Sequence, residues 1–100
     1  MPSTLTIIKL VDLGLKDTVE KLIEDKKCDV NEKDDLDARA VHVAADRNDV
    51  EMLALLVKNG AEIDVKDRFQ RTPLSIAQKK GNKEVEEFIA EKLSAARPTR

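Results

Sequence analysis

The sequence predicts an all-α solenoid in which three helix-turn-helix pairs stack side by side and are joined by extended hairpin loops. A 33-residue period runs through nearly the whole of the 100-residue chain, and a fixed period of this length is typical of repeat arrays. The apolar residues are mostly Leu, Ile, Val and Ala, with only two aromatic residues. Such side chains suit thin layers of short helices better than a large globular core.

The period becomes visible when the chain is shifted by 33 residues without a gap. Apolar residues of the second and third repeats then coincide: Val41 with Leu74, Val43 with Ile76, Ala44 with Ala77, Leu55 with Phe88, and Leu56 with Ile89. The same shift pairs Ile8 with Val41, Leu10 with Val43, Leu22 with Leu55, and Ile23 with Leu56. We therefore expect one domain over residues 1–96, with repeats at about 1–33, 34–66 and 67–96, and a frayed tail at 97–100.

The first repeat is the least regular of the three. Its second helix has an inward face formed by Val19, Leu22 and Ile23. The 33-residue register places Leu15 at the turn between its helices and Lys27 at the end of the second helix, where the second repeat has the turn-forming residues Asn48 and Gly60. We interpret this repeat as a degenerate N-terminal cap.

The second repeat has clearer helix boundaries. Asp49 is a good N-cap for a helix with Met52, Leu53, Leu55 and Leu56 on its buried side, and Gly60 is its expected stop. Asn48, which tolerates a positive φ, stands at the turn between the helices. Arg39 precedes the first helix, which therefore lacks a Ser, Thr, Asp or Asn cap.

The third repeat carries the strongest signals. Thr72 is an N-cap, Pro73 fits the first helical position, and Gly81 ends that helix. Asn82 is expected to cap the next helix, whose inward face is Val85, Phe88, Ile89 and Leu93. We interpret the many charged residues of this last helix as the polar outer face of a C-terminal cap.

These segments resemble ankyrin repeats over residues 4–93. The resemblance rests on TPLSIA at 72–77, VHVAA at 41–45, NGAEID at 59–64, and CDVN at 28–31. The chain departs from the family pattern at Asp37 and Gln70, where the family prefers Gly in the hairpin. The resemblance implies a non-catalytic module that binds a partner protein through the hairpin tips and the concave face of the first helices.

The resemblance also implies which residues meet a partner. These are Asp35, Leu36, Ala38, Asp46, Arg47, Arg68, Phe69, Arg71, Lys79 and Lys80. Leu36 and Phe69 lie one repeat apart, so we expect them to form adjacent apolar knobs. Aromatic and arginine residues are common among interface hot spots, which favours these knobs as anchors for a partner. A partner's acidic groups would then meet the cations of the third repeat. The alternative, left open by the sequence, is that Phe69 folds back onto its own loop.

Catalytic, metal and cofactor functions have little support. The single histidine, His42, matches a structural position of the family that ties neighbouring loops together. One His and one Cys fall short of the four ligands of a zinc site, and the acidic run at 34–37 lacks the Gly and closing Glu of a calcium loop. No glycine-rich phosphate loop is present. Cys28 occupies a small, inward-facing position of the family pattern. We predict no enzyme activity and no cofactor.

Charge and hydropathy limit the classes of partner. The net charge is −2 and the sequence pI about 5.4, which disfavours binding to phosphate backbones. Residues 1–65 hold 9 Lys/Arg against 15 Asp/Glu, whereas residues 66–100 hold 9 against 5, so the two parts differ in the sign of their charge.

We expect no membrane segment and no signal peptide. The expected protein is a monomer in the cell interior, cytoplasmic, with a nuclear location left open. Two other origins also stay open: a terminal module of a larger enzyme or channel, and an engineered scaffold without a natural partner.

Overall fold

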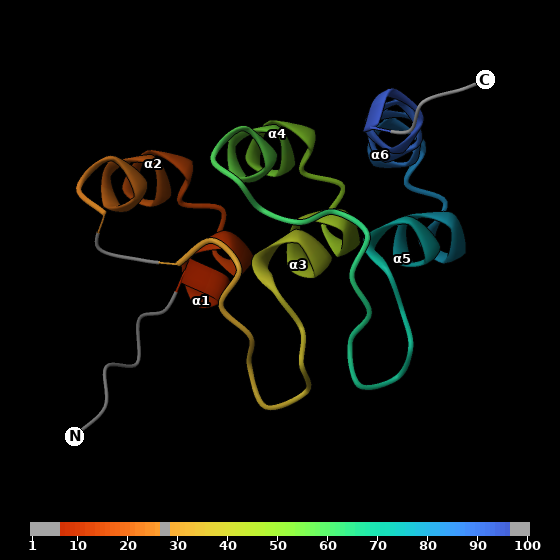
Figure 1. The fold of residues 1–100 in the computed structure, drawn as a ribbon, viewed down its shortest axis with the longest axis horizontal. Helices are drawn as coiled ribbons and strands as arrows, with labels where there is room; N and C mark the ends of the chain where they lie inside the picture. Colours follow the sequence, from red (N-terminus) through yellow and green to blue (C-terminus); the bar gives the residue numbers. More distant parts are fainter. Residues whose placement is uncertain (1–6, 27–28, 97–100) are drawn as a thin grey trace.

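The helices form two parallel rows, with the hairpin loops extending from one of them. The computed structural model describes residues 7–26 and 29–96, without the side chains of 95 and 96. The first row holds the first helix of each repeat: α1 (Ile7–Asp12), α3 (Ala40–Asp46) and α5 (Pro73–Lys80). The second row holds α2 (Lys16–Glu24), α4 (Val50–Lys58) and α6 (Lys83–Ala96) (Figure 1). The described residues contain helices and no strand, which confirms the predicted all-α solenoid.

The hydrophobic core lies between the two rows. Each repeat contributes side chains from both of its helices, among them Val11 and Val19, then Ala45 and Leu53, then Ala77 and Ile89, all fully buried. Ala40 and Ala44 of α3 are fully buried as well. Burial of one Leu or Ile side chain stabilises the fold by roughly 2 kcal/mol. Each helix pair therefore depends on its neighbour to cover its apolar face.

The first helix of the third repeat begins and ends as predicted. The Thr72 hydroxyl accepts a 3.1 Å hydrogen bond from the Ser75 amide, and the Ser75 hydroxyl accepts one of 2.9 Å from the Thr72 amide. Pro73 occupies the first turn, where its missing N–H leaves no donor unsatisfied. Gly81 ends the helix at φ 73°, a left-handed conformation that costs glycine little.

The second repeat confirms two further boundaries. The Asp49 carboxylate accepts the Met52 amide at 3.2 Å and so caps α4, and Asn48 adopts the expected positive φ of 56°. At the start of α3, Arg39 donates its amide to His42 Nδ1 at 3.0 Å. The guanidinium of Arg39 has no acceptor to return a bond to the helix. Only half of a reciprocal cap therefore forms there.

The expected role of the Asn82 side chain was wrong. Its amide group donates to the Ala45 and Asp46 carbonyls at 2.8 and 3.2 Å, at the end of α3 in the previous repeat. The Val85 amide, in the first turn of α6, instead donates to Asn48 Oδ1 at 3.4 Å. Asn82 of the third repeat thus caps the end of α3 in the second repeat, and Asn48 of the second repeat caps the start of α6 in the third. A sequence pattern within one repeat does not contain this cross-repeat geometry.

The turn in the first repeat was also misplaced by one residue. Gly14, not Leu15, has the left-handed conformation, with φ 73°, whereas Leu15 lies at φ −88°. The helices of the first and second repeats therefore match at a shift of 34 residues, which pairs Gly14 with Asn48 and Lys26 (φ 57°) with Gly60 (φ 100°). Asp34 and Asp67 still match at 33 residues, so one extra residue lies between Lys26 and Asp34.

Paired apolar residues explain why the shift of 33 looked correct. Ile7-Ile8, Leu10-Val11 and Leu22-Ile23 each place two apolar residues in a row, so either shift aligns apolar with apolar. Burial distinguishes the two shifts. Ile7 and Val11 are 1% and 0% exposed, whereas Ile8 is only half-buried, and this pattern agrees with the shift of 34. The predictions for Lys27, Cys28 and the tail at 97–100 fall outside the described residues.

Candidate partner-binding surface

One aspartate in each hairpin determines the shape of its tip. Asp34 Oδ1 accepts the amides of Leu36 and Ala38 at 2.8 and 2.9 Å. In the next hairpin Asp67 Oδ1 accepts the amides of Phe69 and Arg71, both at 2.9 Å. A main-chain bond closes each loop, from Asp34 N to Ala38 O at 2.9 Å and from Asp67 N to Arg71 O at 3.0 Å. The two loops therefore have the same construction.

The residues at the ends of these loops take left-handed conformations. Asp37 and Gln70 have φ of 61° and 66°. These are the positions at which the family prefers Gly, and their backbone explains that preference, because Gly adopts positive φ without a steric cost. Both residues are tolerated here because the aspartate and main-chain bonds hold the loop closed.

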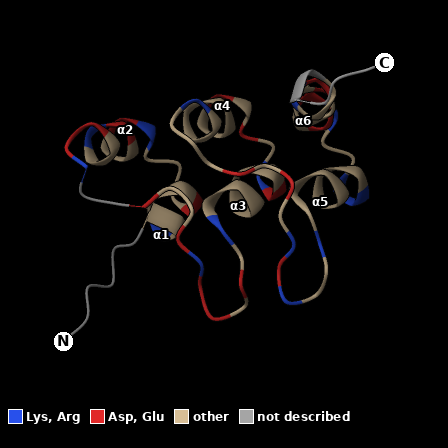
Figure 2. Cartoon of the chain, viewed as in Figure 1, with Lys and Arg blue, Asp and Glu red and all other residues tan. Residues whose placement is uncertain are grey.

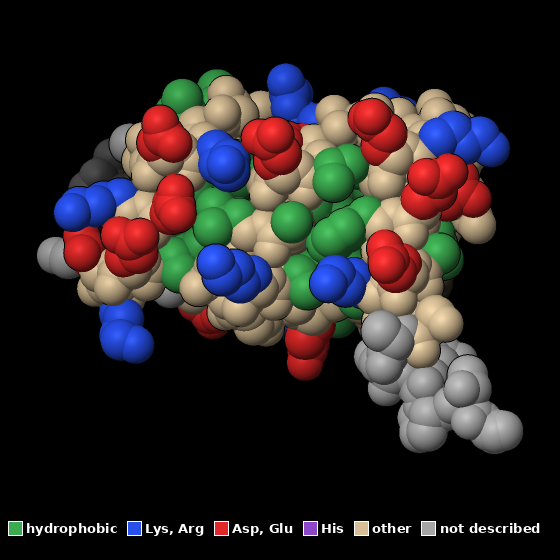
Figure 3. Space-filling model, turned by 90° about the horizontal axis from the view of Figure 1, so that it is seen from above, with side chains coloured by type: hydrophobic (Ala, Val, Ile, Leu, Met, Phe, Trp, Pro, Cys, Tyr) green, Lys and Arg blue, Asp and Glu red, His purple; other side chains and the backbone are tan. Residues whose placement is uncertain are grey.

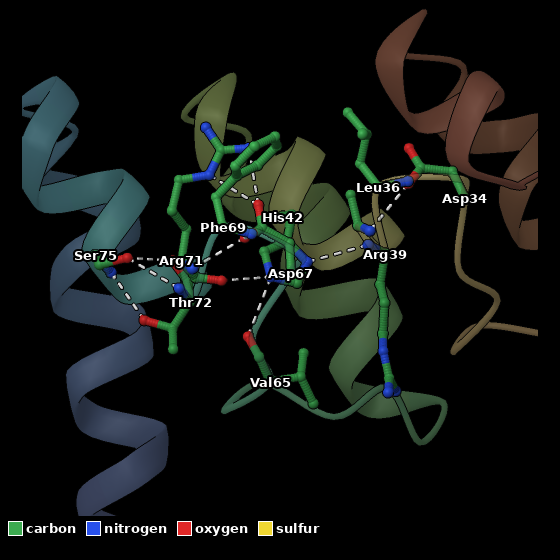
Figure 4. Close-up of polar contacts among 11 residues, drawn as sticks. Asp34, Leu36, Arg39, His42, Val65, Asp67, Phe69, Arg71, Thr72 and Ser75 are labelled. Carbon is green, nitrogen blue, oxygen red and sulfur yellow. Dashed lines mark hydrogen bonds and ion pairs between the residues drawn. The ribbon is translucent and has the colours of Figure 1, made fainter.

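The two tips present apolar side chains to solvent. Leu36 is 43% exposed and Phe69 is 58% exposed, and Figure 4 shows them on neighbouring loops. The Arg68 amide donates to the Leu36 carbonyl at 2.8 Å, so the main chain joins one tip to the next. Asp35 is exposed beside Leu36, whereas Ala38 is half-buried.

Phe69 is held by its own loop and still faces solvent. The Arg71 guanidinium lies over its ring, 5.2 Å from the centroid. The same guanidinium bonds Asp67 Oδ2 through both Nε and a terminal nitrogen, each at 2.8 Å. Asp67, Arg71 and Phe69 therefore form a connected group from the loop base to the tip (Figure 4). The ring contacts its loop, as the alternative prediction had it, yet more than half of its surface stays exposed.

The Asp67 carboxylate is buried but remains ionised. Its burial by itself would raise the pKa. Hydrogen bonds from the Arg71 amide and side chain and from the Phe69 amide outweigh that effect, as does the positive charge of Arg71, and the pKa of Asp67 is lowered from its ordinary value. A buried carboxylate with this many donors is a structural element of the loop.

His42 ties the base of the hairpin before α5 to helix α3. Its Nδ1 accepts the Arg39 amide at 3.0 Å, so Nε2 carries the proton and donates to the carbonyls of Val65 and Arg71, both at 3.0 Å. Burial lowers the pKa of His42, although the carbonyls and the nearby Asp67 oppose that effect. Main-chain groups therefore occupy both ring nitrogens, which is the structural role that the sequence predicted.

The exposed face of the first-row helices carries paired charges. Lys80 contacts Asp46 at 3.0 Å and Arg47 contacts Asp12 at 3.5 Å, in each case between neighbouring repeats. A groove of about 500 Å³ lies beside α3 and α5 and is lined by Asp46, Arg71, Ser75, Ile76, Lys79 and Lys80. Arg71 connects this groove to the Phe69 tip. Ser75 and Ile76, which are not among the predicted partner-binding residues, form part of its wall.

The two hairpins differ in charge. Acidic residues colour the loop before α3, and basic residues are prominent in the loop before α5 (Figure 2). Within residues 7–26 and 29–96, no ion pair involves Arg68 or Lys79, and both side chains belong to exposed residues. The predicted surface thus offers two cations that the chain does not itself neutralise.

Comparison with known proteins identifies this architecture. The family model described as "Ankyrin repeats (3 copies)" matches residues 7–100. The chain belongs to the ankyrin-repeat family. Ankyrin repeats are in general non-catalytic modules that bind other proteins, and the resemblance carried by the TPLSIA and VHVAA segments is confirmed.

Among its relatives are ankyrin repeats within much longer proteins. The human protein "Neurogenic locus notch homolog protein 1" is 38% identical over 74 residues, which is 74% of this chain and 3% of that protein. The proteins of the same name from Mus musculus and Cricetulus griseus are 38% identical over 71 residues, or 71% of this chain and 3% of their length. The chain therefore spans only a small part of the curated relatives it matches.

The described ankyrin repeats offer no assembled metal site. No group of three or more His, Cys, Asp and Glu residues in that part of the chain lies close enough to hold a metal ion. No helix among the described residues is long and apolar enough to cross a bilayer.

Proposed function

We propose that this ankyrin-repeat chain binds a partner protein through its hairpin tips and the concave face of helices α3 and α5. The observation that supports this most is Phe69, a large aromatic side chain that is 58% exposed at a loop tip. Aromatic residues at exposed, well-positioned sites are typical interface anchors. Contact with Arg71, itself bonded to the buried Asp67, positions the ring before a partner arrives.

The proposed partner presents acidic groups around an apolar residue. Its apolar residue would pack against Leu36 and Phe69, and its carboxylates would meet Arg68 and Lys79. Arg71 and Lys80 already pair with Asp67 and Asp46, so they contribute less to a new contact. Asp35, Ala38, Asp46 and Arg47 complete the proposed surface, which gives it a mixed charge that favours one orientation of the partner.

An affinity capture from lysate tests this proposal. Wild-type chain and the Leu36→Ala/Phe69→Ala variant are immobilised after circular dichroism has shown that both fold. We expect a protein that the wild type retains and the tip variant loses, because a partner anchored on these side chains loses most of its apolar contact area.

A matched control uses two other exposed leucines among the described residues. Leu13 and Leu15 are 52% and 43% exposed at the turn of the first repeat, and Leu13→Ala/Leu15→Ala removes a comparable apolar area there. We expect this control to retain the same protein as the wild type. Equal retention by the tip variant would place the interface elsewhere and contradict the proposal.

A second proposal concerns the context in which the module acts. The relatives match over 3% of their own length, which favours a repeat module that works inside a larger protein, whether a terminal array of an enzyme or channel or another assembly. The engineered-scaffold alternative predicts instead that no protein is retained specifically.

We further propose that residues 1–96 act as one domain, which is a monomer in the cell interior. Sedimentation tests the oligomeric state, and cell fractionation tests the location.

A further inference from the structure

A second groove lies on the opposite side of the molecule from the hairpins. It has a volume of about 630 Å³ and runs between the start of α4 and the length of α6. The lining residues are Asn48, Asp49, Val50, Glu51, Glu84, Glu87, Phe88 and Glu91. In the view onto the second row of helices, a hydrophobic strip lies between α4 and α6, with carboxylates along the α6 side and basic side chains at its lower edge (Figure 3).

Charge in this groove is entirely of one sign. Five of the eight lining residues are acidic and none is basic. Asp49 caps α4, Glu51 contacts Lys16 at 3.9 Å, and Glu84 accepts from Asn48 at 3.5 Å. In the described part of the chain, no ion pair involves Glu87 or Glu91. These two carboxylates, one helical turn apart, are available to a cationic ligand.

The arrangement fits an extended chain better than a metal ion. No three acidic residues of the described chain come close enough to share an ion, so the carboxylates are spread along the groove instead of converging on one point. Separated carboxylates match a polypeptide whose basic side chains are themselves separated. The half-buried Val50 and Phe88 give the floor an apolar surface for a hydrophobic side chain of that polypeptide.

The aromatic ring of Phe88, which lines this groove, already contacts a lysine of the chain. The Lys92 ammonium lies over the Phe88 ring, 5.4 Å from its centroid. Lys92 is exposed and is not one of the lining residues. The contact shows that a basic side chain can approach this ring, and cation–π attraction of this kind adds to charge complementarity.

We propose that the groove between α4 and α6 binds a lysine- and arginine-rich peptide segment of a second protein, with one apolar side chain of that segment on Val50 and Phe88. This site is separate from the hairpin surface and opposite to it in charge preference. The two surfaces together would let the chain hold an acidic partner on one side and a basic partner on the other.

Fluorescence anisotropy with a labelled probe tests the groove. The probe is the synthetic peptide Lys-Arg-Lys-Leu-Lys-Arg-Lys, titrated with wild-type chain and with Glu87→Lys/Glu91→Lys. We expect saturable binding to the wild type and an affinity at least about tenfold weaker in the variant, because two attractive charges become repulsive. No saturable binding to the folded wild type would overturn the proposal.

Glu20→Lys/Glu24→Lys is the matched control, with the same charge change on exposed residues of α2. We expect it to bind the probe within about twofold of wild type, since these residues lie outside the groove. An equal loss in both variants would show attraction to overall charge only and would contradict a defined site. Replacing the probe's Leu by Gly should weaken binding several-fold, and unchanged affinity would refute the role given to Val50 and Phe88.

Leu36→Ala/Phe69→Ala separates this site from the hairpin surface. We expect that variant to bind the basic probe like the wild type while it loses the partner captured through the tips. Loss of probe binding in the tip variant would assign both ligands to one surface and overturn the proposal of a second site.

Discussion

The amide of Arg68 donates a 2.8 Å hydrogen bond to the carbonyl of Leu36 and thereby joins the tips of two hairpins. The bond runs from main chain to main chain, so it does not depend on either side chain. Substituting Leu36 and Phe69 therefore changes what the tips present to a partner and leaves their connection in place. That property makes the tip variant a suitable probe of binding as distinct from folding.

We expect Asp67→Ala to lower the free energy of unfolding by about 2 kcal/mol, since a buried acceptor of several hydrogen bonds is lost. Asp67 is 3% exposed and serves the amides of Phe69 and Arg71. The control is Asp34→Ala, which removes the two equivalent amide bonds of the other hairpin from an exposed position and, among the described residues, without an arginine partner, with a loss of about 1 kcal/mol. Urea unfolding measures both. A loss for Asp34→Ala as large as for Asp67→Ala would show that neither the burial of Asp67 nor its pairing with Arg71 adds to stability.

Acidification should destabilise the fold through His42. Burial lowers the pKa of His42 in the folded chain, so the unfolded chain binds the proton more readily. Its contribution is fully present above the ordinary pKa of about 6.5 and is lost as the pH falls from there toward the lowered folded value. The lowered pKa of Asp67 acts only in a more acidic range, below about 4.

Because His42 is the single histidine of the sequence, one variant isolates its contribution. Urea unfolding of wild type at about pH 7.5 and pH 5 should give a lower stability at the acidic pH. His42→Gln, which has no titrating group in this range, is expected to be less stable at both values and to change much less between them. The same pH dependence in wild type and variant would rule out His42 as its source.

Gln70→Gly should stabilise the protein by roughly 1 kcal/mol, because Gln70 holds a left-handed conformation that disfavours side chains with a Cβ. Its φ is 66° and it is exposed. Gln78→Gly provides the opposite sign, since Gln78 lies within α5 and Gly in a helix costs about 1 kcal/mol relative to a good helix former. Thermal unfolding compares the two, and destabilisation by both would refute the argument from φ.

The position of the turn in the first repeat, at Gly14, can be tested by substitution. Gly14 has φ 73°, and a Cβ added there would meet no atom within 4 Å, so Gly14→Ala would be strained by its backbone alone and should cost about 1 kcal/mol. Leu15→Ala, at an exposed residue with negative φ, should change stability by less than about 0.5 kcal/mol. A larger loss of stability for Leu15→Ala than for Gly14→Ala in urea unfolding would contradict the assignment of the turn to Gly14.

Much of the local structure could be predicted from sequence, because short-range chemistry determines it. Thr72-Pro73, Asp49 and Gly81 each act within one turn of helix, and their roles were confirmed. The apolar period likewise predicted Val85 and Ile89 as core. The first repeat shows the limit, since adjacent apolar pairs such as Ile7-Ile8 fit two registers equally well and only burial distinguishes them.

By itself, the sequence determined the repeat class, the stacked helix pairs, the caps at Asp49, Thr72 and Gly81, and the structural character of His42. The tertiary structure alone decided the contacts between repeats: the capping of helices in neighbouring repeats by Asn48 and Asn82, the hydrogen bond between Arg68 and Leu36, and the groove between α4 and α6. The physical reason is distance along the chain. These contacts join residues about one repeat apart or more, and their geometry follows from how neighbouring helix pairs pack.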